Sequence, residues 1–213
     1  MALVIIGAGG HGKVVADAAR AAGIEPACYV DRRPPAAFVA DLPVYDSLNS
    51  AYAAGLDALT HFIVAIGDNG QRVDQFAAYC ETGLEPLTIL HPTAAISASA
   101  RLGRGVYVGA YAVVNPDACV ADNAIINTAA VVEHDCRVSQ AGFIAPGAIL
   151  CGEASVGPRT LVGAHATLIP TVSVGADSLV ASGAVVTKSW PDGSRLFGVP
   201  AAPLVVADVA GNA

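Results

Sequence analysis

The chain has 213 residues, of which 54% are hydrophobic and only 14% are charged, and its formal net charge is −7. This length allows one or two domains. Proteins that coat duplex nucleic acid usually carry a basic face, so the acidic balance argues against that class. Polar residues, glycines and prolines interrupt each long apolar stretch well before the ~18 residues that a membrane-spanning helix needs.

The cysteines and the N-terminus indicate the compartment. The five cysteines are scattered and form neither a C-x-x-C pair nor a zinc-ligand spacing. The N-terminus has no basic segment followed by a small-residue cleavage site, which a secretory signal peptide would have. We therefore expect a cytoplasmic protein with free thiols and no metal.

The first domain is expected over residues 1–91, where strand-like and helix-like segments alternate. In chain order we expect a strand over Leu3–Gly7, a helix over Gly12–Ala22, a strand over Ala27–Val30, a helix over Leu48–Ala54, a strand over His61–Gly67, a helix over Asn69–Thr82 and a strand over Leu87–Leu90. This alternation is typical of an α/β fold with a small parallel sheet. Ligands of such sheets bind beyond the carboxyl ends of the strands.

A glycine-rich loop follows the first expected strand, where Gly7, Gly9 and Gly12 spell G-x-G-x-x-G. Backbone N–H groups at the start of a helix attract phosphate oxygens, and side chains there would block the approach. Asp31 lies where dinucleotide folds keep a ribose-binding acid. The pattern alone fits NAD, a smaller nucleotide or a tight turn without a ligand. A domain of this size is half of a dinucleotide fold, which favours a Rossmann-like mononucleotide-binding domain.

The second half of the chain is a hexapeptide repeat. Every sixth residue from Ile96 to Val186 is Ile, Leu or Val, sixteen in all, and the residue two places earlier is small in thirteen of fifteen hexads. This pattern predicts a parallel β-helix in which three hexads close one coil and the aliphatic residue points inward. We expect five coils over residues 92–188, stacked to a height of roughly 24 Å, and a C-terminal tail over residues 189–213.

The hexads, followed by GVPA at Gly198–Ala201, resemble the left-handed β-helix acyltransferases. The joining of a GAGGHG domain to such a prism resembles a narrower family, the bacterial nucleotide-sugar N-acetyltransferases of bacillosamine and perosamine synthesis. This resemblance covers roughly Leu3 to Ala201. It implies transfer of an acetyl group from acetyl-CoA to the amine of a UDP- or GDP-linked 4-amino-4,6-dideoxy sugar, in polysaccharide biosynthesis. It also implies that the glycine loop holds the phosphates of the nucleotide sugar.

The segment Asn127–Val138 resembles the catalytic segment of this family. The hexad pattern turns His134 and Asp135 outward, because Val132 and Cys136 occupy the core positions. The resemblance makes His134 the general base, which suits an imidazole that must take a proton from an amine. It makes Asp135 the carboxylate that orients the imidazole, with Glu133 as the fallback, and it places Asn127 near the sugar.

The resemblance also implies two sets of binding residues. The nucleotide sugar is expected to contact Gly9, His11, Gly12, Asp31, Gly67, Asn69 and Arg72. Acetyl-CoA is expected between two prisms of a homotrimer, near Gly152, Ala164, Ser182 and Lys188. Outward-facing Tyr107, Tyr111, Phe143 and Leu161 also favour a trimer, since a lone prism would expose them.

This sequence departs from the family pattern at several positions, and several alternative functions stay open. Arg32 and Arg33 follow Asp31 where some relatives have a second acid that selects the base, so the nucleotide is open. Ala202 replaces the basic residue usual after GVPA, so Lys188 or Arg195 is expected to meet the CoA phosphates. Phe143 stands where some relatives have a second histidine. A β-helix carbonic anhydrase is disfavoured because no H-x₄-H pair exists, whereas O-acetylation and a non-catalytic nucleotide-sugar-binding protein stay as alternatives.

Overall fold

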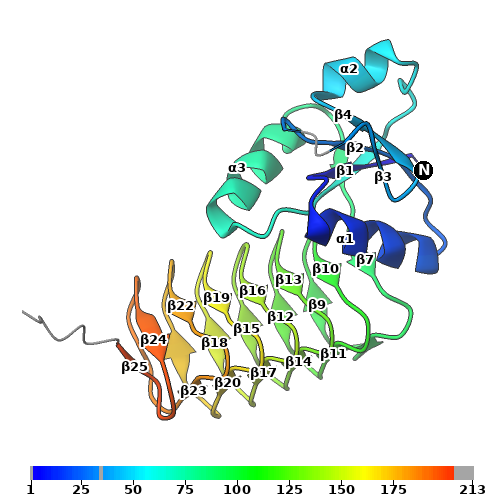
Figure 1. Ribbon diagram of the computed structural model, residues 1–213. Helices are drawn as coiled ribbons and strands as arrows, with labels where there is room; N and C mark the ends of the chain where they lie inside the picture. The colour runs from blue at the N-terminus through cyan, green and yellow to red at the C-terminus, as the bar shows by residue number, and fades with distance from the viewer. Residues whose placement is uncertain (1, 34–35, 204–213) are drawn as a thin grey trace, which may run out of the picture.

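A computed structural model describes residues 2–33 and 36–203 of the chain. Within these residues the chain forms an α/β unit and a prism of stacked coils (Figure 1). The α/β unit lies over the first coils of the prism, and the later coils extend away from it. None of the helices in the described ranges is long and apolar enough to cross a membrane.

The α/β unit contains nine helices and strands among its described residues. They are β1 (Leu3–Ile6), α1 (Gly10–Ala21), β2 (Pro26–Val30), β3 (Phe38–Val39), β4 (Leu42–Tyr45), α2 (Leu48–Ala53), β5 (His61–Val64), α3 (Asn69–Cys80) and β6 (Glu85–Pro86). The sheet order is β3-β4-β2-β1-β5-β6. All neighbouring strands run parallel except β3, which runs antiparallel to β4 at the edge.

The central strand β1 is buried on both faces, which explains its uninterrupted apolar sequence. Leu3 and Ile5 pack against α1, whereas Val4 and Ile6 pack into a second cluster with residues of α2 and α3. The helices therefore cover opposite faces of the sheet. The glycine loop follows β1 directly and lies at the carboxyl edge of the sheet, as the sequence predicts.

The prism consists of three parallel sheets. We name the covered sheet after the α/β unit that lies on it, and the apolar and polar sheets after their outward side chains. The covered sheet contains β7 (Ile89–Leu90), β10 (Tyr107–Val108), β13 (Ile125–Ile126), β16 (Phe143–Ile144), β19 (Leu161–Val162), β22 (Leu179–Val180), β24 (Arg195–Phe197) and the antiparallel β25 (Ala202–Pro203). The apolar sheet contains β8 (Ala95–Ile96), β11 (Val113–Val114), β14 (Val131–Val132), β17 (Ile149–Leu150), β20 (Thr167–Leu168) and β23 (Val185–Val186). The polar sheet contains β9 (Arg101–Leu102), β12 (Cys119–Val120), β15 (Arg137–Val138), β18 (Ser155–Val156) and β21 (Ser173–Val174).

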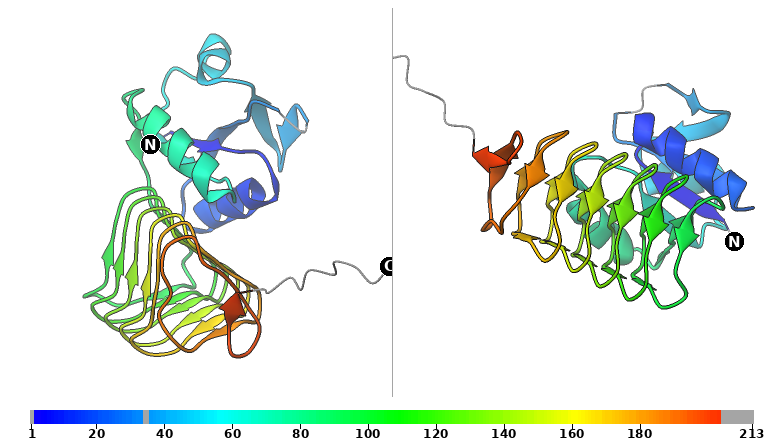
Figure 2. Two further views of the ribbon diagram at one scale, coloured as in Figure 1. Left: turned by 90° about the vertical axis from the view of Figure 1, so that its left-hand side faces the viewer. Right: turned by 90° about the horizontal axis from the view of Figure 1, so that it is seen from below.

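The register of the prism follows the repeat. Parallel partners from β7 to β23 lie 18 residues apart, as Val113 pairs with Val131 and Val131 with Ile149, whereas β22 pairs with β24 at an offset of 16 residues. The second residue of each two-residue strand points inward, and the predicted inward residues from Val108 to Val186 are all buried. The predicted core positions are thus confirmed. Figure 2 shows the stacked coils of the β-helix from two further sides.

Three edges run along the prism where one sheet turns into the next. The Asn127 edge joins the covered sheet to the apolar sheet, the His134 edge joins the apolar sheet to the polar sheet, and the Asn123 edge joins the polar sheet to the covered sheet. One residue of each turn from Gly105 to Gly183 has a positive φ, as at Asn123 (59°), Ala129 (54°) and Asp135 (59°). This left-handed conformation lets each coil turn sharply between two short strands.

The structure differs from the sequence prediction around residue 87. Of the strand expected over Leu87–Leu90, only β7 forms, and it pairs with β10 as the first strand of the covered sheet. The α/β sheet is instead completed by β6, which lies just before the expected range. The hairpin-like pair β3 and β4 was not expected at all. These strands are short and carry no alternating pattern, so local sequence did not indicate them.

The outer face of the covered sheet also differs from expectation. Tyr107 and Ile125 are buried against the α/β unit, and Phe143 packs against the same cluster. Tyr107 and Phe143 are therefore covered by the chain's own α/β unit, and they cannot support a trimer as the sequence suggested. Tyr111 remains 69% exposed.

Candidate active site

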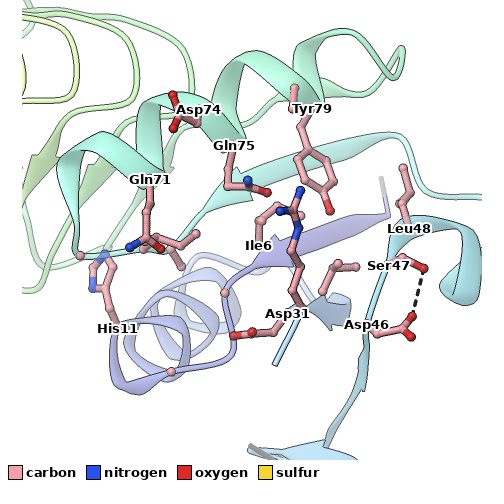
Figure 3. A pocket seen from close by; sticks show the side chains of 18 of the residues that line it. Ile6, His11, Asp31, Asp46, Ser47, Leu48, Gln71, Asp74, Gln75 and Tyr79 are labelled. Carbon is pink, nitrogen blue, oxygen red and sulfur yellow. Dashed lines mark hydrogen bonds between the residues drawn. The ribbon is translucent and has the colours of Figure 1, made fainter. Parts of the chain in front are cut away.

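A pocket of about 890 Å³ opens at the carboxyl edge of the α/β sheet. Side chains of α3, namely Gln71, Asp74, Gln75 and Tyr79, line one side of it (Figure 3). The opposite side is formed by the ends of β1 and β2, the start of α1 and the turn before α2, with the lining residues Ile6, Gly9, His11, Asp31, Asp46, Ser47 and Leu48.

The glycine loop presents bare backbone to this pocket. Helix α1 begins after Gly9, which has no side-chain cap, and a Cβ built on Gly9 or Gly10 would meet no atom within 4 Å. Gly67 lines the pocket from the neighbouring loop and also has open space at its Cα. The first N–H groups of a helix lack intrahelical partners, so this end of the pocket suits an anion.

Asp31 lines the pocket and also holds the glycine loop in place. Its carboxylate accepts hydrogen bonds from the backbone N–H of Ala8 (2.9 Å) and of Arg33 (2.9 Å). The carboxylate therefore joins the loop after β1 to the loop after β2. A charged acceptor for backbone N–H groups gives stronger bonds than a neutral one.

His11 lies where the pocket meets the prism. Its ring contacts Tyr107 edge-on at 5.2 Å between centroids and stacks on Phe143 at 6.3 Å. Burial, together with the positive charge of Arg72, lowers the pKa of His11 to about 4. His11 is therefore neutral near pH 7, and its buried Nε2 has no partner among the described residues.

Three of the residues expected at the nucleotide do not line the pocket. Gly12 packs directly against the carbonyl oxygen of Gly7, so it lets α1 approach β1 rather than contacting a ligand. Asn69 donates from Nδ2 to the carbonyl oxygen of Arg159 in the prism (2.8 Å). Arg72 is fully buried between α3 and the prism.

His134 lies on the His134 edge, between β14 and β15. The side chain is 56% exposed, and its Nδ1 lies 2.9 Å from Oδ2 of Asp135. This hydrogen bond, helped by the charges of Asp135, Glu133 and Glu153, raises the pKa of His134 above its ordinary value of 6.5. With Nδ1 bonded to the carboxylate, Nε2 is the nitrogen left to accept a proton.

Gly152 lies one coil beyond His134 and leaves space for the imidazole. A Cβ built on Gly152 would lie 2.6 Å from both Cε1 and Nε2 of His134. The hydrogen atom of a glycine is therefore required for the ring to adopt this position. Glu133 is turned elsewhere: its Oε2 accepts a hydrogen bond from Asn115 (2.8 Å) one coil earlier.

The remaining residues expected in acetyl transfer lie on two different edges. Lys188 shares the His134 edge, where its Nζ lies 4.7 Å from the ring centroid of Trp190. Asn127, Ala164 and Ser182 lie on the Asn127 edge. These two edges flank the apolar sheet, so one chain does not bring Asn127 next to His134.

Several known proteins are similar to this chain. The family model described as the PglD N-terminal domain matches residues 2–78. The perosamine N-acetyltransferase from Caulobacter crescentus, solved as a histidine-to-asparagine variant in complex with CoA and GDP-perosamine, is 40% identical, with a TM-score of 0.92 over 96% of this chain and 97% of that one. The acetyltransferase domain of PglB from Neisseria gonorrhoeae is 35% identical, with a TM-score of 0.89 over 95% of this chain and 99% of that one.

This chain belongs to the family of nucleotide-linked amino-sugar N-acetyltransferases. A further structure, WeeI from Acinetobacter baumannii, is 20% identical with a TM-score of 0.65 and supports the fold alone.

In this N-acetyltransferase, Cys136 is a poor candidate for an acyl-enzyme. Burial raises the pKa of the Cys136 thiol to about 11, and its Sγ contacts the carbonyl oxygen of Cys151 at 3.1 Å. A thiol that stays protonated is a weak nucleophile. No group of three or more His, Cys, Asp or Glu residues within the described ranges could hold a metal ion.

Sequence reasoning missed one wall of the pocket. Gln71, Asp74, Gln75 and Tyr79 lie on one face of α3, and Asp46 and Ser47 precede α2. The spacing of the α3 residues by three and four places them on one helix face, which was a usable signal. Which face of α3 turns towards the pocket depends on how the helix packs against the prism. No local sequence pattern predicts that packing.

Proposed function

We propose that this protein transfers the acetyl group of acetyl-CoA to the amine of a nucleotide-linked 4-amino-4,6-dideoxy sugar. The observation that carries this proposal is the exposed His134–Asp135 pair, with its free Nε2 next to Gly152, in a chain that also has a phosphate-suited pocket. Relatives crystallised with CoA and GDP-perosamine, or with acetyl coenzyme A, support the same pair of substrates.

In the proposed reaction His134 acts as general base. Its Nε2 takes a proton as the sugar amine attacks the acetyl carbonyl carbon, so that the C–N bond forms. The C–S bond then breaks, and the imidazolium returns the proton to the departing thiolate of CoA. Asp135 stabilises the imidazolium and fixes the tautomer throughout, as carboxylates do in other base–orienter pairs.

The nucleotide part of the substrate is assigned to the pocket of the α/β unit. We propose that Gly9 and Gly67 border the phosphates, that Asp31 borders the ribose and that His11 lies towards the sugar. Five parallel strands with helices on both faces support a Rossmann-like mononucleotide fold for residues 1–91. The left-handed sense of the prism over residues 92–188 is proposed by analogy with the family. The part of the proposed tail after Pro203 lies outside the described residues.

A trimer would complete the transfer site. The outward residues of the apolar sheet are Ala95, Val113, Val131, Ile149, Thr167 and Val185. Five of these six side chains are apolar, and such a ladder favours contact with another copy. Packing this face against a neighbour would bring the His134 edge of one chain towards the Asn127 edge of the next. We propose that acetyl-CoA lies in this cleft, near Gly152 and Lys188 of one chain and Ala164 and Ser182 of the other, and that the enzyme works in the cytoplasm.

The proposal is tested by a thiol-release assay. The protein is mixed with acetyl-CoA and with UDP-, GDP- or dTDP-linked 4-amino sugars, and with the matching sugars that carry a hydroxyl at C4. We expect CoA release with at least one amino sugar and none above background with its hydroxyl counterpart. Equal release with both would favour O-acetylation, and release with neither would reject a sugar acetyltransferase.

A further inference from the structure

Helix α3 lies along the Asn123 edge of the prism. Four residues of this edge, Gly105, Asn123, Ala141 and Arg159, are spaced by 18 and occupy the same place in successive coils. All four have a positive φ, between 53° and 63°. The edge therefore presents a regular row of turns to the helix.

One face of α3 contacts this row in order. Phe76 packs on Gly105, where a Cβ would lie 2.6 Å from the Phe76 ring. Arg72 binds the turns of Asn123 and Ala141, and Asn69 binds the turn of Arg159. Residues three and four apart share a helix face. The helix and the row of turns therefore run in opposite directions. Phe76 and Asn69 each contact one coil, and Arg72 contacts two.

Arg72 makes the central contact and reaches both units. Its guanidinium donates to the carbonyl oxygens of Asn123 (3.1 Å) and Ala141 (2.7 Å) in the prism. It also donates to the carbonyl oxygens of Ile66 (3.0 Å) and Gly67 (3.4 Å), which line the nucleotide pocket. Asn123 returns a hydrogen bond from Nδ2 to the backbone carbonyl of Arg72 (3.1 Å).

Burying a positively charged side chain costs free energy, because the charge loses its hydration. Arg72 has no solvent exposure, and burial lowers its pKa to about 10, so it stays charged near neutral pH. An apolar side chain of similar size would cost less to bury. Only the guanidinium offers five N–H groups in a fixed planar fork, which can meet several carbonyl oxygens at once. The site therefore requires hydrogen-bond donors that point in fixed directions, as well as a side chain of this volume.

We propose that Arg72 is a positioning residue for acetyl transfer. It ties the Ile66–Gly67 turn of the nucleotide pocket to two coils of the prism, and so fixes where the bound sugar's amine lies relative to the prisms. This inference rests on the proposed function. It also replaces the expectation that Arg72 contacts the nucleotide. The guanidinium points to the junction between the α/β unit and the prism, and Arg72 does not line the pocket.

The test compares Arg72→Met with Arg104→Met in the full-length protein. Methionine keeps most of the volume of the side chain and removes the fork. Arg104 lies on the same edge but is exposed, and its guanidinium pairs with Asp122 (3.4 Å), so its substitution is the matched control. The measurements are the Kd of GDP and UDP, kcat at saturating nucleotide sugar, the KM of acetyl-CoA and the melting temperature.

We expect Arg72→Met to lower kcat by about 10- to 100-fold, because small displacements of a bound substrate have effects of this size. The Kd of the nucleotide and the KM of acetyl-CoA should change less than threefold, whereas Arg104→Met should change nothing. Weaker nucleotide binding with unchanged kcat would make Arg72 a ligand contact and overturn the proposal. A lower melting temperature with parental kinetics well below it would make Arg72 purely structural and also overturn it.

Amide hydrogen exchange tests the same proposal without any acetylation assay. In Arg72→Met, α3 and the turns at Asn123 and Ala141 should exchange about tenfold faster at a temperature where the protein is folded. Unchanged exchange there would contradict the proposal. If Arg72→Met does not fold, Asn69→Ser, which removes a single bond to the prism, should give a smaller fall in kcat and faster exchange of the start of α3. If the parental protein acetylates no amino sugar, the proposed function fails, and the exchange measurement still decides the role of Arg72 in the junction.

Discussion

At the scale of single residues, His134 is exposed and yet held in one orientation. Asp135 occupies its Nδ1, and Gly152 leaves room beside its Nε2. The hexad pattern alone indicated that both His134 and Asp135 point outward. Asp135 also has the positive φ (59°) that recurs at the turns of the prism.

Replacing His134 should remove the base and leave the fold intact. We expect His134→Ala to lower kcat by roughly 10²- to 10⁴-fold, the usual contribution of a general base. His61→Ala is the control, since His61 lies at the opposite end of its strand from the pocket. A His134→Ala enzyme with near-parental kcat at pH 7.5 would show that another group takes the proton.

The pH dependence should follow the His134–Asp135 bond. The base acts only when neutral, and Asp135 raises its pKa, so kcat/KM should fall as the pH drops through a value above 6.5. Asp135→Asn removes the negative charge and should move this acid limb to lower pH while reducing kcat. A limb at the same pH in Asp135→Asn would mean that it reports another group, and titration of the free amino sugar identifies the substrate's own contribution.

Gly152→Ala should separate catalysis from stability. The added methyl group would overlap Cε1 and Nε2 of His134, and the exposed imidazole can avoid it only by rotating away. We expect kcat to fall by at least about tenfold, because a displaced base loses its alignment. The melting temperature should stay within a few degrees of the parent. Parental kcat in Gly152→Ala would show that the imidazole position seen here is not the one used in transfer.

At the scale of elements, the glycine loop contains two kinds of glycine. Gly9 borders open space in the pocket and has an extended backbone that any residue can adopt, whereas Gly12 touches the carbonyl oxygen of Gly7. The sequence pattern could not distinguish them. The distinction depends on how closely α1 packs on β1.

The two glycines should therefore respond differently to substitution. We expect Gly9→Val to fold normally and to raise the KM of the nucleotide sugar more than tenfold, with little change for acetyl-CoA, because the branched side chain enters the anion site. Gly12→Ala should instead lower the melting temperature, because the methyl group forces α1 away from the sheet. Kinetics and thermal unfolding of both variants check this, and an unstable Gly9→Val with unchanged KM would reverse the assignment.

The elements that the sequence predicted best are the repeated ones. The hexads gave every strand position of the prism from Val108 to Val186, because one short rule repeats in each coil. The other features were harder to predict, because contacts between residues far apart in the sequence determine them. The resemblance to the family implied that Arg72 contacts the nucleotide, but the direction of its side chain is set by Asn123 and Ala141, which are 51 and 69 residues away.

At the scale of the whole molecule, the α/β unit leaves the apolar sheet uncovered. Ile149 is 38% exposed at the middle of its ladder. We expect a trimer in sedimentation experiments at micromolar concentration, and Ile149→Glu should produce monomers because it places a charge in the proposed contact. Ser155→Glu, on the polar sheet, is the matched control and should remain trimeric. A monomeric parent that is fully active would contradict the shared acetyl-CoA cleft.

The most direct test of the account follows the acetyl group into the product. Acetyl-CoA labelled with ¹³C at the carbonyl is incubated with the protein and with the nucleotide-linked 4-amino sugar that releases most CoA, and the product is examined by NMR. We expect the labelled carbonyl to couple to the amide proton and to the proton at C4 of the sugar, and we expect His134→Ala to slow its appearance. A labelled ester on a sugar oxygen, or an equal rate in His134→Ala, would contradict this expectation.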